Sequence, residues 1–222
     1  MTRLALLFDL DGTLVDTDRL HVAAFSHVLG EIGAPPLSTA DYKARVMGFP
    51  NPEIAAFLFP GRPDAEALAA RKEAIFRESL AATVEPVAGI HALLDWAAEA
   101  GAGTAVVTNA PRENARAMLA AAGLAGRLTE LVIGDECPRA KPDPFPYQEA
   151  MRRLGVTPAA SLAFEDSRSG LRAARGSGAR VFGVTTALPA AELLQAGAHD
   201  TIADYTDPAL WGALETLKAR VA

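Results

Sequence analysis

Short apolar runs alternate with helix-forming segments along most of this chain. The runs occupy residues 4–8, 104–107, 131–133, 162–164 and 180–184. Helical spacing and composition fill the intervals, over residues 87–100, 112–122, 144–154 and 169–177. Further helices are expected at 187–196 and 208–219, with a short last strand near 201–202. Runs this short and this apolar are typical of strands buried on both faces, so the alternation predicts an α/β fold with a doubly wound parallel sheet.

Residues 17–83 break this alternation. No strand is expected there, and the apolar residues recur at helical spacing. Proline and glycine clusters at 35–36, 50–52 and 60–63 divide the segment into about four helices. We therefore expect residues 17–83 to form a helical cap domain inserted into an α/β core domain of residues 1–16 and 84–222. The two links between them, near 16–17 and 83–86, would make a natural hinge.

Composition favours a cytoplasmic globular protein. Half of the 222 residues are hydrophobic, which is ample for a sizeable core. No run approaches the roughly 20 apolar residues of a membrane span, and the N-terminus lacks the features of a secretory signal. The single cysteine, Cys137, excludes an intrachain disulfide and agrees with a reducing compartment. We interpret it as a structural thiol.

Charge limits the kind of partner. The formal net charge is −6 and the arginines are dispersed, so neither nucleic acid nor a membrane is expected as a partner. An acidic chain that binds an anionic substrate needs local cations or a metal ion to hold it. No clear exposed stripe fixes the oligomeric state, so a monomer and a homodimer both stay open.

Two carboxylates, Asp9 and Asp11, stand where the first predicted strand ends, and Gly12 follows them. Ligands of open α/β sheets bind outside the carboxyl ends of the strands, so these residues predict a site. A plain turn built from aspartate and glycine is the alternative. A calcium loop that starts at Asp9 is excluded, because its sixth and twelfth positions hold Leu14 and Leu20 in place of glycine and glutamate.

Two more polar clusters follow predicted strands or precede predicted helices. Thr108, Asn109 and Ala110 offer a hydroxyl, an amide and backbone N–H groups at a helix start, which suits a phosphate group. Helix capping by Asn109 is the alternative. Lys141 would reach the same edge of the sheet and neutralise phosphate charge there, unless it is simply solvated.

The last cluster is the acidic pair Glu165 and Asp166, directly after a hydrophobic strand. Capping of the next helix by Asp166 or Ser167 is one interpretation. However, with Asp9 and Asp11 the pair would gather several negative charges, which is costly without a cation. Carboxylate oxygens with positions left for water and phosphate are typical of a Mg²⁺ site.

Together these clusters resemble the four motifs of the haloacid dehalogenase-like (HAD) superfamily of phosphohydrolases, in the same order along the chain. The motifs are Asp9-Leu10-Asp11-Gly12-Thr13, Thr108-Asn109, Lys141 and Glu165-Asp166. The helical insert stands where that superfamily carries its C1-type cap. The resemblance implies a Rossmann-like core, Mg²⁺ as the cofactor, and a phosphoric monoester hydrolase acting on a small phosphorylated metabolite.

By this resemblance, Asp9 is the nucleophile that forms an aspartyl-phosphate, and Asp11 is the general acid and then the general base. Mg²⁺ would be held by the Asp9 carboxylate, the Asp11 backbone carbonyl and Asp166, with Glu165 binding directly or through water. The transferring phosphoryl group would be bound by Thr108, by the N–H groups of Asn109 and Ala110, and by Lys141.

The presence of Asp11 narrows the choice within the superfamily. Haloacid dehalogenases and phosphonatases resemble this motif but lack the second aspartate, so its retention points to a phosphate monoester. Two enzymes remain: a phosphatase similar to phosphoglycolate phosphatase, with phosphorylated sugars or polyols as further substrates, and a phosphomutase of the β-phosphoglucomutase type. A catalytically silent phospho-ligand-binding module is the alternative from another class.

The cap carries the residues expected to set substrate specificity: His21, Gly48 and Asn51. The loop 47–52 lines up with the mutase loop whose arginine grips a second phosphate, and here that position is Asn51. Asparagine in place of this arginine favours a phosphatase over a mutase. Arg45 and Arg62 lie nearby and could either compensate for the lost arginine or be solvated. His21 either faces the site at the cap entrance or packs on a helix face.

Overall fold

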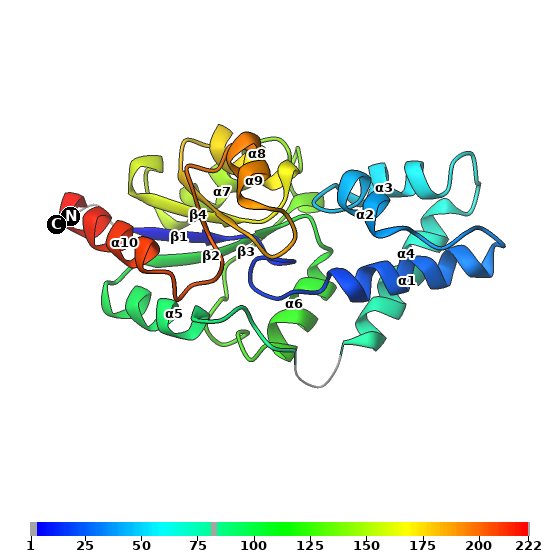
Figure 1. Cartoon of the computed structure of the whole chain (residues 1–222), viewed down its shortest axis with the longest axis horizontal. Coiled ribbons are helices and arrows are strands. Elements are labelled where there is room, and N and C mark those ends of the chain that lie inside the picture. The colour runs from blue at the N-terminus through cyan, green and yellow to red at the C-terminus, as the bar shows by residue number, and fades with distance from the viewer. Residues whose placement is uncertain (1–3, 81–83, 222) are drawn as a thin grey trace.

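A computed structural model describes residues 4–80 and 84–221 of the chain. Expectations for residues 1–3, 81–83 and 222 lie outside the described residues, and so does the start of the second predicted link to the cap. The described residues form an α/β core and a group of helices at one end of it (Figure 1).

The core is built on six parallel strands among the described residues. They are β1 (Ala5–Phe8), β2 (Gly103–Thr108), β3 (Leu131–Ile133), β4 (Ser161–Glu165), β5 (Arg180–Val184) and β6 (Asp200–Ile202). Their order across the sheet is β3-β2-β1-β4-β5-β6, and every pairing is parallel. The predicted doubly wound α/β sheet is therefore confirmed, and β1 lies at its centre.

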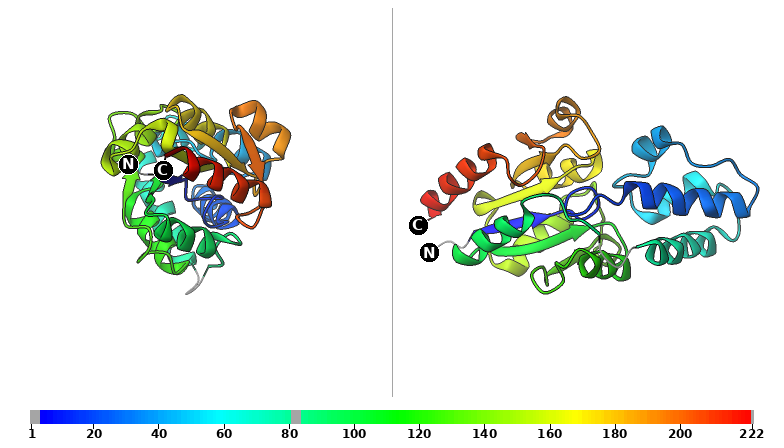
Figure 2. Two further views of the ribbon diagram at one scale, coloured as in Figure 1. Left: turned by 90° about the vertical axis from the view of Figure 1, so that its left-hand side faces the viewer. Right: turned by 60° about the horizontal axis from the view of Figure 1, so that its bottom comes forward.

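Helices cover both faces of this sheet (Figure 2). Leu6 and Phe8 of β1 belong to the apolar cluster that includes α5 (Ile90–Glu99), α6 (Arg112–Ala121) and α10 (Pro208–Val221). Ala5 and Leu7 belong to the cluster that includes α7 (Phe145–Leu154), α8 (Arg168–Gly176) and α9 (Ala190–Ala196). Because neighbouring β1 residues alternate between the two clusters, the strand is buried on both sides, as its apolar sequence requires.

Short 3₁₀ turns complete the core, η1 (Gly134–Glu136) after β3 and η2 (Pro158–Ala160) before β4. Across the described part of the chain, none of the helices combines the length and the apolarity needed to cross a membrane.

Four helices occupy the described part of the predicted cap segment. They are α1 (Asp18–Glu31), α2 (Thr39–Arg45), α3 (Asn51–Leu58) and α4 (Ala65–Ser79). Helices α1 and α4 pack side by side, and α3 packs on α4 (Figure 1). The group lies beyond the end of the sheet to which the chain runs from β1.

The two segments that join these helices to the sheet lie next to each other. Val15 and Pro86 form an isolated antiparallel bridge, and the Val87 N–H donates to the Leu14 carbonyl at 2.9 Å. Adjacent crossings of this kind let two bodies rotate about one axis, because only a few backbone angles need to change.

Candidate active site

The site lies where the strand order reverses around β1. Phe8 pairs with Val106 of β2 on one side and with Phe164 of β4 on the other. Asp9 follows Phe8, and its N–H donates to the Phe164 carbonyl at 3.0 Å. The polar residues that end β1, β2 and β4 therefore meet at one edge of the sheet, at the topological switch point where doubly wound folds bind ligands.

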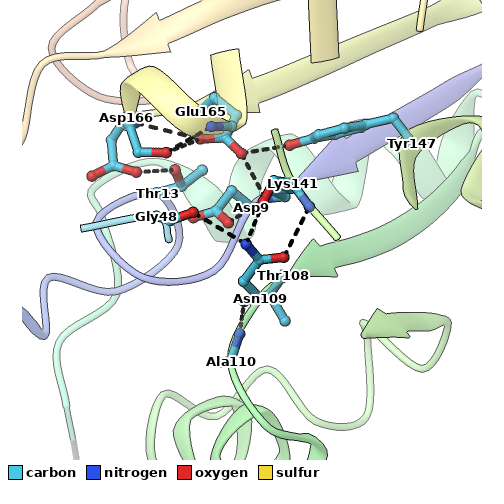
Figure 3. A network of polar contacts seen from close by, with 12 residues as sticks. Asp9, Thr13, Gly48, Thr108, Asn109, Ala110, Lys141, Tyr147, Glu165 and Asp166 are labelled. Carbon is cyan, nitrogen blue, oxygen red and sulfur yellow. Dashed lines mark hydrogen bonds and ion pairs between the residues drawn. The ribbon is translucent and has the colours of Figure 1, made fainter. Parts of the chain in front are cut away.

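Lys141 is the central cation of this edge (Figure 3). Its Nζ donates to Asp9 Oδ1 at 2.6 Å and to Glu165 Oε1 at 2.6 Å, and its side chain is only 1% exposed. The Tyr147 hydroxyl donates to the same Glu165 oxygen at 2.8 Å. The sequence-based alternative of a solvated lysine is therefore wrong.

Burial and charge act in opposite directions on this cluster. Burial alone would lower the pKa of Lys141, but the carboxylates of Asp9 and Glu165 outweigh it and the pKa is raised. Burial is the main cause that raises the pKa of Asp9 well above its usual range, and the charge of Glu165 raises it further, whereas the charge and hydrogen bond of Lys141 lower it. The edge thus carries more negative charge than its one buried lysine balances.

Asp166 is the residue that most directly indicates a cation site. Its Oδ1 accepts a hydrogen bond from Thr13 Oγ1 at 3.3 Å, but its buried Oδ2 has no partner among the described residues. Burial first, and then the charges of Asp9 and Glu165, raise the pKa of Asp166 well above its usual range. A buried carboxylate oxygen without a donor is costly, and a bound metal ion would satisfy it.

Three carboxylates offer oxygens to such an ion: one oxygen each of Asp9, Glu165 and Asp166 lie within 4.8 Å of one another. These hard oxygen donors fit a divalent cation such as Mg²⁺. Both Glu165 oxygens already accept hydrogen bonds, Oε1 from Lys141 and Tyr147 and Oε2 from the Ser167 hydroxyl at 3.1 Å. Asp9 and Asp166 are therefore better placed than Glu165 to bind the ion directly.

The side chain of Asp11 faces the cap helices and not the acidic cluster. Its Oδ1 accepts from Thr17 Oγ1 at 2.6 Å and from His21 Nε2 at 2.7 Å. Burial would raise the pKa of Asp11, but His21 and Thr17 outweigh it, so that the pKa is lowered. Asp11 is predicted to bind the metal through its backbone carbonyl. These side-chain contacts do not involve that carbonyl, so the prediction stays open.

His21 is held from its other side by Lys72 of α4. The Lys72 Nζ lies 2.8 Å from His21 Nδ1, and because an ammonium can only donate, Nδ1 accepts and Nε2–H donates to Asp11. The His21 ring stacks on Phe76, with centroids 3.9 Å apart. His21 is thus both packed on a helix face and directed at the site, which combines the two interpretations of its sequence position.

The segment after β2 is organised by the Asn109 side chain. Its Oδ1 accepts from the Lys141 N–H at 3.2 Å, and its Nδ2 donates at 3.1 Å to the carbonyls of Lys141 and Gly48. The amide makes no cap to α6, so the capping interpretation of Asn109 is wrong. The Ala110 N–H donates to Thr108 Oγ1 at 3.0 Å.

Ser167 begins the helix after β4. Its hydroxyl accepts from the Gly170 N–H at 3.0 Å and so caps α8. Of the two capping candidates in the sequence, Ser167 is therefore the one used, which leaves the Asp166 carboxylate available to a ligand.

A cavity opens over these residues, between the strand ends and the cap helices. The core contributes Asp9, Asp11, Thr108, Asn109, Ala110, Lys141 and Asp166, and the cap contributes His21, Gly48 and Asn51. Every candidate site residue thus lines the cavity except Glu165, which joins the cluster through its contact with Lys141.

Sequence reasoning missed two residues on the cavity wall, Lys72 and Glu73 of α4. They are 3% and 7% exposed. Neighbouring opposite charges within a helical segment are typical of a solvated face, so the local pattern gave no reason to place them inside. Only the packing of α4 against α1 brings them to the site.

The two arginines considered as replacements for a phosphate-gripping residue lie elsewhere. The Arg45 guanidinium stacks over the Phe57 ring at 3.8 Å, and Arg62 pairs with the partly exposed Asp64 at 2.8 Å. Neither lines the cavity. The structure therefore disfavours the interpretation that Arg45 or Arg62 replaces the phosphate-binding arginine of the mutase loop.

Substitution of Gly48 by alanine is expected to weaken closure of the cap. Gly48 has φ +77°, and a Cβ would lie 2.5 Å from Ser167 Oγ and 2.8 Å from its Cβ. We expect kcat/KM to fall by about tenfold, on the order of 1.4 kcal/mol. Gly61→Ala is the matched control, because Gly61 has φ +69° but open space around it. Equal losses in the two variants would mean that backbone strain alone, and not the Ser167 contact, is responsible.

Comparison with known proteins agrees with this geometry. The family model of the haloacid dehalogenase-like hydrolases matches residues 6–184. A phosphorylated carbohydrates phosphatase from Thermotoga maritima is 31% identical over 87% of this chain and 91% of its own length. A phosphoglycolate phosphatase from Pseudomonas putida is 31% identical over 81% of this chain and 68% of its own.

A solved structure is also similar. CbbY from Rhodobacter sphaeroides in complex with xylulose-(1,5)bisphosphate has a TM-score of 0.82 and 28% identity, and the match covers 93% of this chain and 96% of that one. The chain belongs to the haloacid dehalogenase-like hydrolase family. The predicted family and the predicted class, a phosphoric monoester hydrolase, are thereby confirmed.

Proposed function

We propose that this protein is a Mg²⁺-dependent phosphatase that hydrolyses a small phosphate monoester through an aspartyl-phosphate on Asp9. The observation that carries the proposal is the contact of Lys141 with Asp9, 2.6 Å, beside the unpartnered oxygen of Asp166. The arrangement offers a nucleophile, a buried cation and an open metal ligand within one cluster. The substrate classes we consider are phosphoglycolate and phosphorylated sugars or polyols.

In the first step, a carboxylate oxygen of Asp9 attacks the phosphorus atom, and the bond to the leaving oxygen breaks. Asp11 donates a proton to that oxygen, so an alcohol leaves. The pKa of Asp11 is lowered by His21 and Thr17, but an incoming phosphate brings negative charge that favours the protonated acid. Thr108, the N–H groups of Asn109 and Ala110, and Lys141 orient the phosphoryl group.

In the second step, the Asp11 carboxylate takes a proton from water, and that water attacks the phosphorus of the aspartyl-phosphate. The bond between Asp9 and phosphorus breaks, which releases inorganic phosphate and restores the carboxylate. Asp11 has lost its proton in the first step, and its lowered pKa keeps it in the carboxylate form that can accept a proton.

Asp9 and Asp166 would hold the Mg²⁺ ion, with the Asp11 backbone carbonyl as predicted and Glu165 directly or through water. When bound, the ion supplies neutralisation of the charge on the transferring phosphoryl group. The hydrogen bond from Asn109 to Gly48 and the contact of His21 with Asp11 both join the core to the cap segment. Cap closure therefore assembles the acid and excludes water during the first step.

The mutase alternative receives less support. A mutase must hold a bisphosphorylated intermediate by its second phosphate, and Asn51 stands where the gripping arginine would be. Neither Arg45 nor Arg62 reaches the cavity. A cytoplasmic location and a monomeric or homodimeric state stay predictions from the sequence.

Removal of the metal is expected to abolish turnover. With p-nitrophenyl phosphate as substrate, we expect EDTA to reduce the rate to background and added Mg²⁺ to restore it, because the acidic cluster needs a cation to accept a phosphate dianion. An enzyme indifferent to EDTA would contradict the metal site. A catalytically silent binding module would show no Mg²⁺-dependent turnover at any substrate concentration.

The same ion is expected to stabilise the fold in a pH-dependent way. The raised pKa values of Asp9 and Asp166 mean that the folded metal-free protein binds more protons than the unfolded chain, so its stability falls as pH rises through those values. Mg²⁺ at 100 times its Kd contributes about 2.7 kcal/mol, or roughly 5–10 °C in Tm. Thermal melts should show this shift near neutral pH and a smaller one at about pH 5.

A further inference from the structure

One acidic side chain of the cavity has no place in the proposed chemistry. Glu73 of α4 lines the cavity from the cap side and is 7% exposed. Buried carboxylates are rare unless they are paired, so this residue calls for a physical account. Its own contacts define what it can bind.

Glu73 is fixed in position through a single oxygen. Its Oε2 accepts from Asn114 Nδ2 at 2.6 Å and from Lys72 Nζ at 3.1 Å. Asn114 lies on α6 of the core, is fully buried, and is held in turn by Arg77 at 2.7 Å. The carboxylate therefore has a defined orientation before any ligand arrives.

The second oxygen of Glu73 is free to accept. Among the residues that the structure describes, none donates a hydrogen bond to Oε1. The described side-chain nitrogen and oxygen atoms that are both fully buried and unpartnered are Asp166 Oδ2 and Ser169 Oγ, so Glu73 Oε1 stays accessible. A rigid, accessible carboxylate oxygen is an acceptor for a hydroxyl group and repels an anion.

Within the described part of the chain, no unpaired cation on the cavity wall offsets this carboxylate. Of the described basic side chains that line the cavity, Lys141 contacts Asp9 and Glu165, His21 contacts Asp11, and Lys72 contacts Glu73 itself. Lys72 and Glu73 leave the cap side formally neutral. A second anionic group of a substrate would therefore meet Glu73 without a free cation to hold it.

The rest of the cap wall is mostly apolar. It is formed by Phe25, Tyr42, Val46, Met47, Phe49 and Ile54. The Tyr42 hydroxyl already donates to Asp18 at 2.9 Å. Such a wall suits the carbon skeleton of a leaving group, while Glu73 suits one of its hydroxyls.

We propose that Glu73 is a specificity-determining residue that selects an uncharged, hydroxyl-bearing leaving group and disfavours a leaving group with a carboxylate or a second phosphate. The inference rests on the proposed phosphatase function and narrows it to phosphate esters of neutral polyols or sugars. Glu73 Oε1 accepts a hydrogen bond from a leaving-group hydroxyl, and Asn114 and Lys72 hold it in place.

Two matched pairs of substrates test the inference on the wild-type enzyme with Mg²⁺. Ethylene glycol monophosphate and phosphoglycolate differ by a hydroxymethyl group in place of a carboxylate. Fructose 1-phosphate and fructose 1,6-bisphosphate differ by a second phosphate. We expect kcat/KM to be higher for the neutral member of each pair by about tenfold or more, since like charges in a site are strongly unfavourable. A preference for the anionic members would overturn the inference.

A conservative variant then assigns the selectivity to this side chain. Glu73→Gln retains the shape and an acceptor for Asn114, and we expect the neutral-to-anionic ratio of kcat/KM to fall by about tenfold, mainly through KM. Glu66→Gln on the exposed side of the same helix is the control, and its ratio should equal that of the wild type. An unchanged neutral-to-anionic ratio in folded Glu73→Gln would also overturn the inference. Loss of a purely structural residue would lower kcat/KM for both substrates by the same factor and leave the ratio unchanged.

The design separates this inference from the function on which it rests. Absence of Mg²⁺-dependent hydrolysis of every substrate, p-nitrophenyl phosphate included, would refute the proposed function. In that case, calorimetric titration of the Asp9→Asn protein with the same pairs still decides the inference. Tighter binding of the neutral members supports it, and equal or tighter binding of the anionic members refutes it.

Discussion

Asp9→Asn is expected to lower kcat by at least about a thousandfold with p-nitrophenyl phosphate, because an amide cannot form the aspartyl-phosphate. The effect should fall on kcat, since the phosphate-binding groups stay in place. Steady-state kinetics at saturating Mg²⁺ measure it. Substantial residual turnover in a preparation free of other phosphatases would remove Asp9 from the nucleophile role.

The fold of this variant should survive. Asparagine has the shape of aspartate, and Lys141 retains its contact with Glu165 at 2.6 Å. The substitution also removes the buried Asp9 carboxyl group, whose pKa is raised by burial because its charged form is unfavourable there. The Tm of the metal-free protein should therefore not fall by more than a few degrees. Asp95→Asn, at an exposed ion pair with Arg127, is the control and should keep full activity.

Lys141→Met is expected to damage both activity and stability. The variant leaves Asp9 and Glu165 without their shared cation, and removal of one partner of a buried ion pair costs about 3–5 kcal/mol. We expect kcat/KM to fall at least about a hundredfold, because charge neutralisation of the phosphoryl group is lost. Urea unfolding and kinetics measure the two effects, with exposed Lys218→Met as the control.

The stability loss should depend on pH. The pKa of Lys141 is raised, so its contribution is fully present below the ordinary lysine range and is lost only as pH rises above it. In the variant, protonation of Asp9 or Glu165 removes the repulsion between their carboxylates. The difference in free energy of unfolding between variant and wild type should therefore narrow as pH falls from about 7 to 5. A difference that grows on acidification would contradict the assignment of Lys141 as the cation of this cluster.

Much of the fold and the core half of the site could be predicted, for a geometric reason. The apolar runs identify the strands, and parallel strands bring their polar carboxyl ends to the same edge. Asp9, Thr108 and Asp166 are far apart along the chain yet meet there, because each directly follows or ends a run of buried residues. The position of Lys141 after a strand allowed it to reach this edge, but the choice between that and a solvated lysine needed the family resemblance, since a single lysine in a loop carries no local signal of burial.

The cap half of the site could not be predicted in the same way. Lys72 and Glu73 acquire their positions from helix packing, and helical periodicity does not state which face meets the core. The amide of Asn109 similarly has partners 32 and 61 residues away, at Lys141 and Gly48, which its capping propensity does not indicate. The carboxylate that Glu73 contributes to the cap wall could therefore not be predicted before α4 was placed beside α1.

The two hydrogen-bonded links at Leu14–Val15 and Pro86–Val87 have a consequence for how this enzyme can diversify. In the proposed mechanism, bond breaking depends on groups at the strand ends, and we infer that discrimination between leaving groups depends on the helical insert, which leaves and rejoins the sheet at one point. Substitutions within the insert can thus recruit a new metabolite without disturbing the reacting atoms. Grafting a relative's insert between these two links should transfer its substrate preference onto an otherwise unchanged hydrolase.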